Sequence, residues 1–277
     1  MTNRSDFTAA FASSSAAEAY DEVLVPRLFT PCAEILLSRL GLRPGETLLD
    51  VACGTGIVVL LAAPMLGPGG LVIGRDINEA MVVRARSHAL PPGSAGVALG
   101  VSPAAPLDLD DESVDAITCQ QGLQFFPDPD AALAEMQRCL RPGGRAGIAV
   151  WFGIEECLLW AALEVGLAER FGAQRAADIR QPFSWPGADA LTAAMTGAGF
   201  ADVRLSDHTI VMHFEAGVRQ AMHAIATTPF AADVSAIGAD DYDRMMHTVM
   251  RHLGRSTNLD DTVDIPTRTW IATGVRG

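Results

Sequence analysis

The stretch Leu48-Leu49-Asp50-Val51-Ala52-Cys53-Gly54-Thr55-Gly56 decides how this chain folds. The apolar run Thr47–Val51 predicts a short buried strand, and the apolar run Ile57–Ala63 predicts a helix directly after the glycines. Glycines between a strand and a helix let the backbone turn tightly, and they leave bare N–H groups that a ligand can approach closely. The stretch therefore predicts an α/β domain with a ligand site at this turn.

Two classes of protein use this turn, the dinucleotide oxidoreductases and the S-adenosylmethionine (SAM) methyltransferases. The dinucleotide fingerprint needs a third glycine three positions after the second, and that position is Val59. The segment from Asp50 to Gly56 closely resembles the first motif of class I SAM-dependent methyltransferases of the ubiquinone/menaquinone-biosynthesis type. Taken alone, the glycines are also compatible with a turn that only joins a strand to a helix. The resemblance implies that the cofactor is contacted by Asp50, Ala52, Gly54, Thr55 and Gly56.

A second apolar strand, Leu71–Gly74, leads to Asp76, about 20 residues after the glycines. A carboxylate at the end of the second strand can accept hydrogen bonds from both hydroxyls of a ribose. Asp76 is also a suitable N-cap for the helix expected from there to about Ala89. Nicotinamide enzymes place an acid at this position too, so Asp76 predicts nucleoside binding without choosing the cofactor. In the family that the chain resembles, Ile77 and Met81 would enclose the adenine.

The segment after the third expected strand, Val97–Val101, departs from the family pattern. Its sequence is Ser102-Pro103-Ala104, where the family usually has Gly-Asp-Ala with an Asp that accepts from the adenine amino group. Pro103 supplies neither a carboxylate nor an N–H group. Adenine recognition is then expected from the Ser102 hydroxyl, the Ala104 N–H and apolar stacking, or from a neighbouring group such as Asp108.

A fourth expected strand, Ser113–Cys119, is followed by the loop 120–128. Ligands of open α/β sheets bind at the carboxyl ends of the strands, which places this loop beside Gly54 and Asp76. The loop closely resembles the family motif in which Gln120 and Gln121 hold the methionine amino group of SAM. Gln124 and Phe125 would then face the methyl acceptor, while core packing is the alternative role for the phenylalanine.

The chain is expected to form a Rossmann-like α/β fold. A turn at Leu140-Arg141-Pro142-Gly143-Gly144, a frequent feature of these methyltransferases, precedes a fifth strand at Ala146–Trp151. The resemblance extends over residues 43–151 and implies a seven-stranded, mostly parallel sheet in the order 3-2-1-4-5-7-6. We divide the chain into an N-terminal helical cap (1–45), a SAM-binding core (46–152) and a segment (153–277) that adds a helical cap and the last helix and strands of the core sheet.

The regions outside the core are expected to cover the site. An N-terminal helix at Phe7–Tyr20 would lie over the cofactor, with Tyr20 either facing it or packing on the sheet edge. Helices are expected at Glu155–Phe171, Asp189–Thr196 and through most of Ala216–Leu253. Strands are expected at Val203–Phe214 and Ile265–Val275, with the last strand reversed between the fifth and the sixth.

Composition limits the classes of partner. A formal charge of −13 and the lack of any basic run argue against a nucleic-acid partner. The longest apolar run is too short to cross a bilayer, and no signal peptide is apparent, so we expect no membrane partner. Five cysteines without a Cys-x-x-Cys pair indicate reduced thiols in the cytoplasm and no metal site. A homodimer is one option for the oligomeric state.

We therefore expect a SAM-dependent methyltransferase that converts SAM to S-adenosylhomocysteine (SAH) and methylates a small molecule on O, N or C, in secondary metabolism or quinone-type chemistry. The alternative is a SAM-binding protein of the same fold that acts as a cyclase or a scaffold. A nicotinamide oxidoreductase is disfavoured by Val59 and by the later motifs. The catalytic residue is unknown, and the candidates for a general base are His223, His247 and Tyr20.

Overall fold

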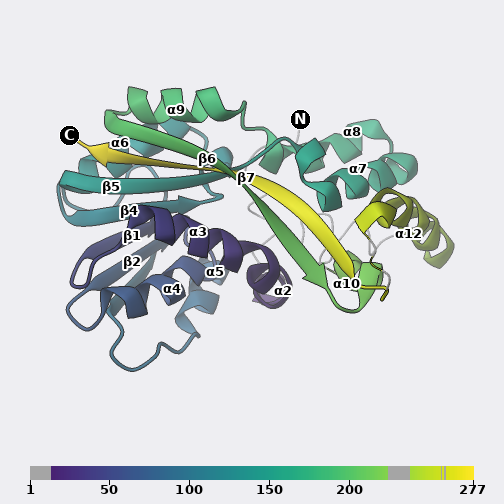
Figure 1. Ribbon diagram of the computed structural model, residues 1–277, viewed down its shortest axis with the longest axis horizontal. Coiled ribbons are helices and arrows are strands. Elements are labelled where there is room, and N and C mark those ends of the chain that lie inside the picture. The colour runs from purple at the N-terminus through teal and green to yellow at the C-terminus, as the bar shows by residue number, and fades with distance from the viewer. Residues whose placement is uncertain (1–13, 224–237, 257, 259) are drawn as a thin grey trace.

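The computed structural model describes residues 14–223, 238–256, 258 and 260–277. Its centre is a seven-stranded sheet in the order β3-β2-β1-β4-β5-β7-β6 (Figure 1). The strands are listed here with their bounds: β1 Thr47–Val51, β2 Leu71–Asp76, β3 Gly96–Val101, β4 Val114–Gln120, β5 Leu140–Trp151, β6 Phe200–Phe214 and β7 Val263–Arg276. The strand order predicted from the sequence is confirmed.

The first five strands are parallel, and β7 runs antiparallel to both β5 and β6. A parallel sheet is covered by helices on both faces, so its central strands are apolar almost throughout. This holds for β1, where Leu48 and Leu49 are fully buried on opposite faces. Because these strands are parallel, the carboxyl ends of β1, β2 and β4 lie at one edge of the sheet, next to the glycine turn, Asp76 and the loop after β4.

Helices cover both faces of the sheet (Figure 1). On one face lie α3 (Thr30–Leu40), α4 (Ile57–Leu66) and α5 (Glu79–Arg86), and on the other lie α6 (Pro129–Cys139) and α9 (Ala188–Gly197). One buried cluster joins α3 and α4 to β1 and β2, and a second joins α6 and α9 to β4 and β5. Contact between helix and sheet is close at Gly147, where an added Cβ would lie 2.9 Å from a methyl carbon of Leu36 on α3.

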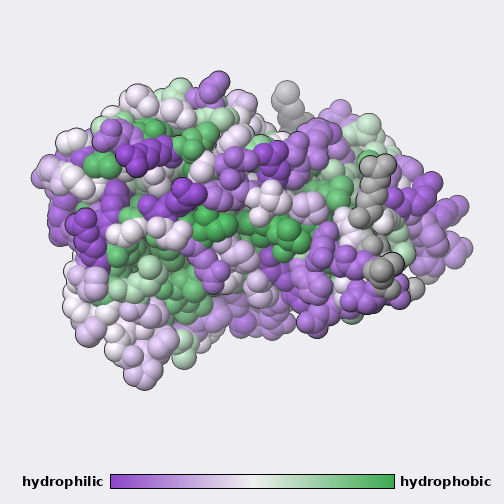
Figure 2. All heavy atoms as spheres, viewed as in Figure 1, coloured by the Kyte–Doolittle hydropathy of each residue, from purple (hydrophilic) through white to green (hydrophobic). Residues whose placement is uncertain are grey.

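A third buried cluster connects the N-terminal helices to the helices near the end of the chain. The N-terminal part is α2 (Ser14–Leu24), the π-helical turn η1 (Val25–Phe29) and α3. The later helices and helical turns are η3 (Ile154–Glu156), α7 (Leu158–Phe171), α8 (Ala173–Ala176), η4 (Ala177–Phe183), α10 (Gly217–His223), α12 (Ala239–Leu253) and η6 (Gly254–Ser256). The strands β6 and β7 extend past the parallel strands and reach α10 and α12 (Figure 1). The surface at this end of the molecule is mostly hydrophilic (Figure 2).

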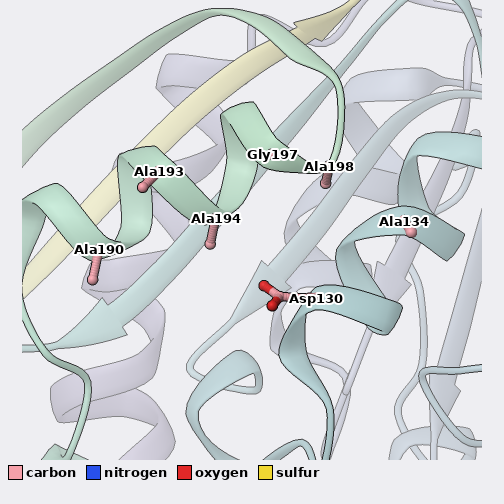
Figure 3. A pocket seen from close by; sticks show the side chains of 7 residues that line it. All are labelled: Asp130, Ala134, Ala190, Ala193, Ala194, Gly197 and Ala198. Carbon is pink, nitrogen blue, oxygen red and sulfur yellow. The ribbon is translucent and has the colours of Figure 1, made fainter.

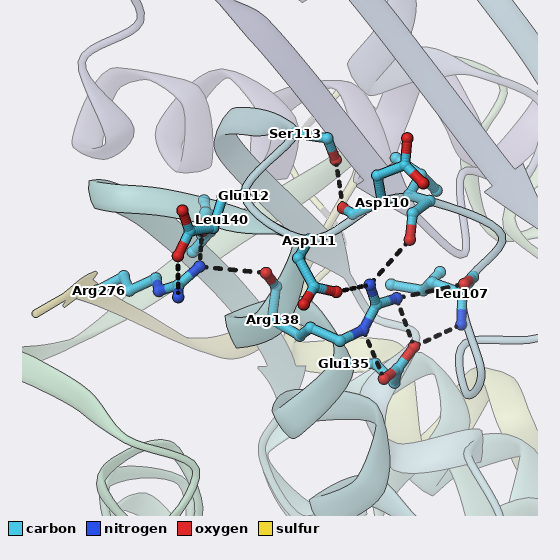
Figure 4. Close-up of polar contacts among 10 residues, drawn as sticks. Leu107, Asp110, Asp111, Glu112, Ser113, Glu135, Arg138, Leu140 and Arg276 are labelled. Carbon is cyan, nitrogen blue, oxygen red and sulfur yellow. Dashed lines mark hydrogen bonds and ion pairs between the residues drawn. The ribbon is translucent and has the colours of Figure 1, made fainter.

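An acidic turn between β3 and β4 is held by ion pairs with arginines (Figure 4). Arg138 on α6 pairs with Asp111 at 2.6 Å and with Glu135 at 2.9 Å. Arg276 near the end of β7 pairs with Glu112 at 2.8 Å and also donates to the Leu140 carbonyl oxygen. These ion pairs fasten the turn to α6 and to the last strand, which explains the acidic run structurally.

Several predicted boundaries were wrong. The helix after β2 is shorter than expected, because it begins at Glu79 under an Asn78 N-cap and ends at Arg86. The fifth strand starts at Leu140 and so includes the Pro-Gly-Gly turn. The expected helix Glu155–Phe171 is divided at Cys157 into η3 and α7. Part of the helix expected at Phe7–Tyr20 and part of the one at Ala216–Leu253 fall outside the described residues.

Candidate active site

The turn after β1 has the strained backbone that its glycines predict. Ala52, Gly54 and Gly56 all have positive φ, at 58°, 53° and 90°. A Cβ added to Gly56 would lie 3.1 Å from the Cβ of Ala85, so this glycine allows close packing against α5. A Cβ added to Gly54 would meet no atom within 4 Å. Gly54 thus presents bare backbone to open space, at the N-terminal side of α4.

Asp76 joins the end of β2 to this turn. Its Oδ2 accepts a hydrogen bond from the Gly54 N–H at 2.8 Å, and its Oδ1 accepts one from the Asn78 N–H at 2.8 Å. Burial raises the pKa of Asp76, while these backbone donors lower it. Each carboxylate oxygen has a second lone pair, so both can still accept a hydrogen bond from a ligand. The structure therefore brings Gly54 and Asp76 into direct contact.

Apolar side chains follow β2 and β3 on the side of Asp76. Ile77 is 63% exposed and Val101 is 50% exposed, which is unusual for such residues, whereas Met81 is buried. Val101 pairs with Asp76 across the two strands. Exposed apolar side chains beside a buried carboxylate suit a flat, apolar ring attached to a sugar. The predicted roles of Ile77 and Met81 stay predictions.

The segment around Pro103 contains the groups expected to replace the Asp that the family usually has at this position. Ser102 is buried, and its hydroxyl donates to the carbonyl oxygen of Pro103 at 3.1 Å. Asp108, suggested above as a substitute, accepts from Arg75 Nε at 2.7 Å. This hydrogen bond from Arg75 holds the pKa of Asp108 below its ordinary value. Ser102, Pro103 and Ala104 follow β3 directly, at the same edge as Asp76.

Asp50 is a buried carboxyl on β1 with one unpaired oxygen. Its Oδ1 accepts from the Thr118 hydroxyl at 2.8 Å, while its Oδ2 has no partner among the described residues. The pKa of Asp50 is raised to about 7. Burial is the main cause and the negative charge of Asp76 adds to it, while the hydrogen bond from Thr118 acts in the opposite direction. A neighbouring cation would favour the charged form, so Asp50 can respond to a positively charged ligand.

The raised pKa of Asp50 predicts a pH dependence of stability. An acid with a raised folded-state pKa binds its proton more tightly in the folded protein, so stability falls as pH rises from the unfolded value of 3.8 to about 7. Between about pH 5 and pH 8 we expect the free energy of unfolding to fall in the wild type by roughly 2–3 kcal/mol more than it falls in Asp50→Asn. Urea denaturation at both pH values measures this. The control is Asp130→Asn, which changes an exposed carboxylate. If the free energy of unfolding changed equally with pH in Asp50→Asn and in the wild type, the prediction would be wrong.

The loop after β4 packs directly on the glycine turn. A Cβ added to Gly122 would lie 2.6 Å from the Cβ of Ala52, so the two turns touch there. Gln120 donates from Nε2 to the Phe29 carbonyl oxygen at 3.1 Å, and its Oε1 is buried with no partner in the described part of the chain. Gln121 has a positive φ of 56°. The predicted cofactor loop is thus adjacent to the turn and is linked to the N-terminal helices.

Tyr20 packs against the cluster that joins the N-terminal helices to the later helices. Its ring lies 4.9 Å from that of Phe29, which in turn lies 6.0 Å from the ring of Trp151. Burial raises the pKa of Tyr20, and the negative charge of Asp76 is the next largest cause. Tyr20 therefore packs against the third buried cluster, and its predicted role at the cofactor stays a prediction.

The candidate bases are less well placed. His247 is exposed on α12, and its Nδ1 lies 2.8 Å from the Asp243 carbonyl oxygen of the same helix. His223 ends α10, and its side chain lies outside the described part of the structure. Gln124 and Phe125 form the turn η2 (Leu123–Phe125) directly after β4, and Gln124 is buried. A catalytic role for any of these residues stays a prediction.

One contact residue was missed by the sequence analysis. Thr269 on β7 is fully buried and accepts a hydrogen bond from Gln121 Nε2 at 2.8 Å. It lies 148 positions from Gln121 in the chain. No local pattern distinguishes it from other strand threonines, because the contact depends on the insertion of β7 beside β5.

A separate hollow lies between α6 and α9 and has a volume of about 510 Å³ (Figure 3). Its lining consists of Asp130, Ala134, Ala190, Ala193, Ala194, Gly197 and Ala198. None of the predicted site residues belongs to it. Apart from the Asp130 carboxylate its walls are formed by alanine and glycine, which offer few polar side chains to orient a small ligand.

No helix within the described ranges is both long enough and apolar enough to serve as a membrane span. The same residues contain no group of three or more His, Cys, Asp or Glu side chains arranged to hold a metal ion.

Comparison with known proteins identifies the family. Residues 49–148 match the family described as "Methyltransferase domain". The chain is 36% identical over 192 residues to the nocamycin O-methyltransferase of Saccharothrix syringae, a match that covers 64% of this chain and 66% of that protein. The chain belongs to the SAM-dependent methyltransferase family. The resemblance of the first motif is confirmed. This family member is also 37% identical over 110 residues to the ubiquinone/menaquinone biosynthesis C-methyltransferase of Hahella chejuensis, covering 39% of this chain and 44% of that protein.

The chain spans less than two thirds of the length of these curated relatives. Among solved structures, the family fold is shared with phosphoethanolamine N-methyltransferase 2 of Haemonchus contortus, in complex with phosphomonomethylethanolamine and S-adenosylhomocysteine. The TM-score is 0.62 at 18% identity, and the match covers 100% of this chain and 60% of that one. At this identity the likeness shows the fold of the present chain and no more.

Proposed function

We propose that this member of the SAM-dependent methyltransferase family transfers the methyl group of SAM to a small-molecule acceptor and releases SAH. The observation that carries the proposal is the convergence of three groups at the carboxyl ends of β1, β2 and β4. These groups are the open backbone of Gly54, the Asp76 carboxylate and the unpaired Oε1 of Gln120. An adenosyl amino acid needs all three kinds of contact.

The residues present fit SAM. The open space at Gly54 would admit the amino-acid end of the cofactor, and the spare lone pairs of Asp76 would accept both ribose hydroxyls. The unpaired Oε1 of Gln120 and the unpaired Oδ2 of Asp50 are buried acceptors suited to an ammonium group. Ile77 supplies an exposed apolar surface for adenine. Tyr20 and Phe29 would cover the bound cofactor from the side of the N-terminal helices.

SAM supplies a methyl group activated by a positively charged sulfur. In the transfer, a bond forms between the acceptor atom and the methyl carbon while the sulfur–carbon bond breaks and its electron pair stays on sulfur. The residues of this chain hold the two reactants in line and exclude water. Such positioning alone can contribute up to roughly 7–11 kcal/mol to lowering the barrier. A base is needed only where the acceptor atom loses a proton.

The names of the relatives support a small-molecule acceptor, since one is named as a nocamycin O-methyltransferase and the other as a ubiquinone/menaquinone biosynthesis C-methyltransferase. The methylated atom is oxygen in the name of one relative and carbon in that of the other, and for this chain the proposal covers oxygen, nitrogen or carbon. All five cysteines are buried and free, which supports a reducing compartment such as the cytoplasm.

The proposal is tested by supplying SAM together with a panel of hydroxylated aromatic compounds and quinols. We expect SAH to form only when an acceptor is present, together with a product heavier than the acceptor by one methylene unit in mass spectrometry. Calorimetry with SAH checks binding independently. SAM binding without consumption, combined with an isomerised compound of unchanged mass, would instead support the cyclase alternative. A protein that binds neither SAM nor SAH would refute the proposal.

A further inference from the structure

A small ionic cluster ties the helix α2 to α5. The Asp21 carboxylate on α2 accepts a hydrogen bond from Arg84 Nε at 2.8 Å, and Nε2 of His88 lies 3.1 Å from the same oxygen. The Asp21 side chain is 8% exposed, whereas those of Arg84 and His88 are 27% and 25% exposed. One largely buried carboxylate thus holds two basic side chains, one from α5 and one from the turn after it.

Further acidic side chains on α2 add to this attachment. The pKa of Arg84 is raised, first by its hydrogen bond with Asp21 and then by the negative charges of Asp21, Glu18 and Glu22. Glu18 and Glu22 are exposed. Dissolved salt screens exposed and half-exposed charges, so the attachment of α2 to α5 is expected to weaken as ionic strength rises.

The same N-terminal segment has a second attachment on the other side of the glycine turn. Gln120, at the end of β4, donates from Nε2 to the Phe29 carbonyl oxygen at 3.1 Å. The helix α5 packs on β2 and β3, and β1 lies between β2 and β4 in the sheet. Eight helical steps from Asp21 to Phe29 rise about 12 Å, and two strand spacings amount to about 10 Å. Residues 14–29, which we call the strap, therefore reach across the carboxyl end of β1.

The turn η1 gives the strap a pivot. The helix α3 that follows it is fixed to the sheet, because Leu36 packs closely against Gly147 of β5. Between α2 and α3, η1 is π-helical and contains Pro26, which has no N–H to donate to the preceding turn. Helices bend at π-helical turns and at prolines. The helix α2 can therefore swing about η1 while α3 stays in place.

We infer that the Asp21 cluster is an ionic latch on the strap, and that its opening sets the rate at which SAM enters and SAH leaves. The inference rests on the proposed function and adds to it the step that limits cofactor exchange. The latch joins α2 to α5, so it holds the strap in the free protein and in the cofactor complex alike. An interaction present in both states leaves their equilibrium unchanged. The latch therefore slows exchange without altering affinity.

The test measures the association and dissociation rate constants of SAH by stopped flow, in the full-length protein and in the variants Asp21→Asn and Arg84→Gln. We expect each substitution to raise both rate constants by about tenfold and to leave the dissociation constant within about twofold of the wild type. The double variant should be no faster than either single variant, because both residues act through one interaction. Added salt should speed exchange in the wild type and have little effect in the double variant.

The matched control is Arg86→Gln on the same helix. Arg86 donates to the Leu99 carbonyl oxygen of β3 at 2.7 Å, so its loss should leave both rate constants at the wild-type values. Hydrogen exchange gives a readout that needs no cofactor. The amides of α2 should exchange faster in Asp21→Asn than in the wild type, while those of α4 should not change.

The possible outcomes separate this inference from the proposed function. Unchanged rate constants in the folded variants Asp21→Asn and Arg84→Gln would overturn the latch, as would equal acceleration in Arg86→Gln. A faster dissociation with unchanged association would also overturn it, since that result is typical of a residue that contacts the cofactor. A wild type that binds no SAH would refute the proposed function, whereas SAH binding at rates that ignore the latch would refute this inference alone.

Discussion

Asp76→Ala is expected to lower the affinity for SAH by about 100-fold or more. The carboxylate is placed to accept both ribose hydroxyls, and hydrogen bonds to a charged group contribute about 1.5–3 kcal/mol each. The substitution also removes the acceptor that holds the Gly54 N–H at 2.8 Å, so the glycine turn loses its attachment to β2. Isothermal titration calorimetry with SAH measures the effect directly.

The matched control is Asp130→Ala, which removes an exposed carboxylate from the start of α6, outside the predicted site. It should bind SAH as the wild type does. Circular dichroism and thermal unfolding establish that both variants are folded. If folded Asp76→Ala retained SAH affinity within about twofold of the wild type, a difference below 0.5 kcal/mol or so, the ribose assignment would be wrong.

Gly54→Val is expected to block cofactor binding by filling the space that the cofactor needs. A Cβ at this position would meet no protein atom within 4 Å, so the new side chain projects into the open space beside the turn. The φ of 53° costs a branched residue about 1–2 kcal/mol in stability. We expect a moderate loss of stability and a loss of SAH affinity of about 100-fold, equivalent to roughly 3 kcal/mol.

The variant Gly143→Val separates the effect of backbone strain from the effect of filling the ligand space. Gly143 has a φ of 74°, and a Cβ there would also meet nothing within 4 Å, but it lies in the turn at the beginning of β5 and not at the carboxyl-end edge. The two variants should therefore be destabilised by similar amounts, with SAH affinity lost only in Gly54→Val. A parallel loss of affinity in both variants would show that backbone strain, and not occupation of the ligand space, is responsible.

Much of the core could be predicted from local sequence. The strand β1 has the bounds expected from its apolar run. The glycines and Asp76 lie together as expected, with Gly54 in contact with Asp76, because parallel strands end at the same edge of the sheet. The strand order came from the resemblance to a family and is confirmed. Boundaries at caps were less predictable, since the Asn78 N-cap competes locally with Asp76 for the start of α5.

The polar connections across the site could not be predicted in the same way. The hydrogen bond from Gln120 to the Phe29 carbonyl oxygen depends on how the N-terminal helices fold over the sheet. The contact of Gln121 with Thr269 depends on β7 returning between β5 and β6. Both join residues that are far apart in the chain, and neither residue type has a pattern that marks it as part of a site.

The sequence by itself determined the strand–turn–helix unit at Leu48–Gly56 and the acid at Asp76, because glycine conformation and strand periodicity are local properties. Only the tertiary structure decided which polar atoms are buried without a partner. That depends on the packing of distant elements around the crevice, as at Asp50, Gln120 and Gln124. Motifs thus predict which residues bind the cofactor, whereas the unpaired atoms of those residues are determined by long-range packing.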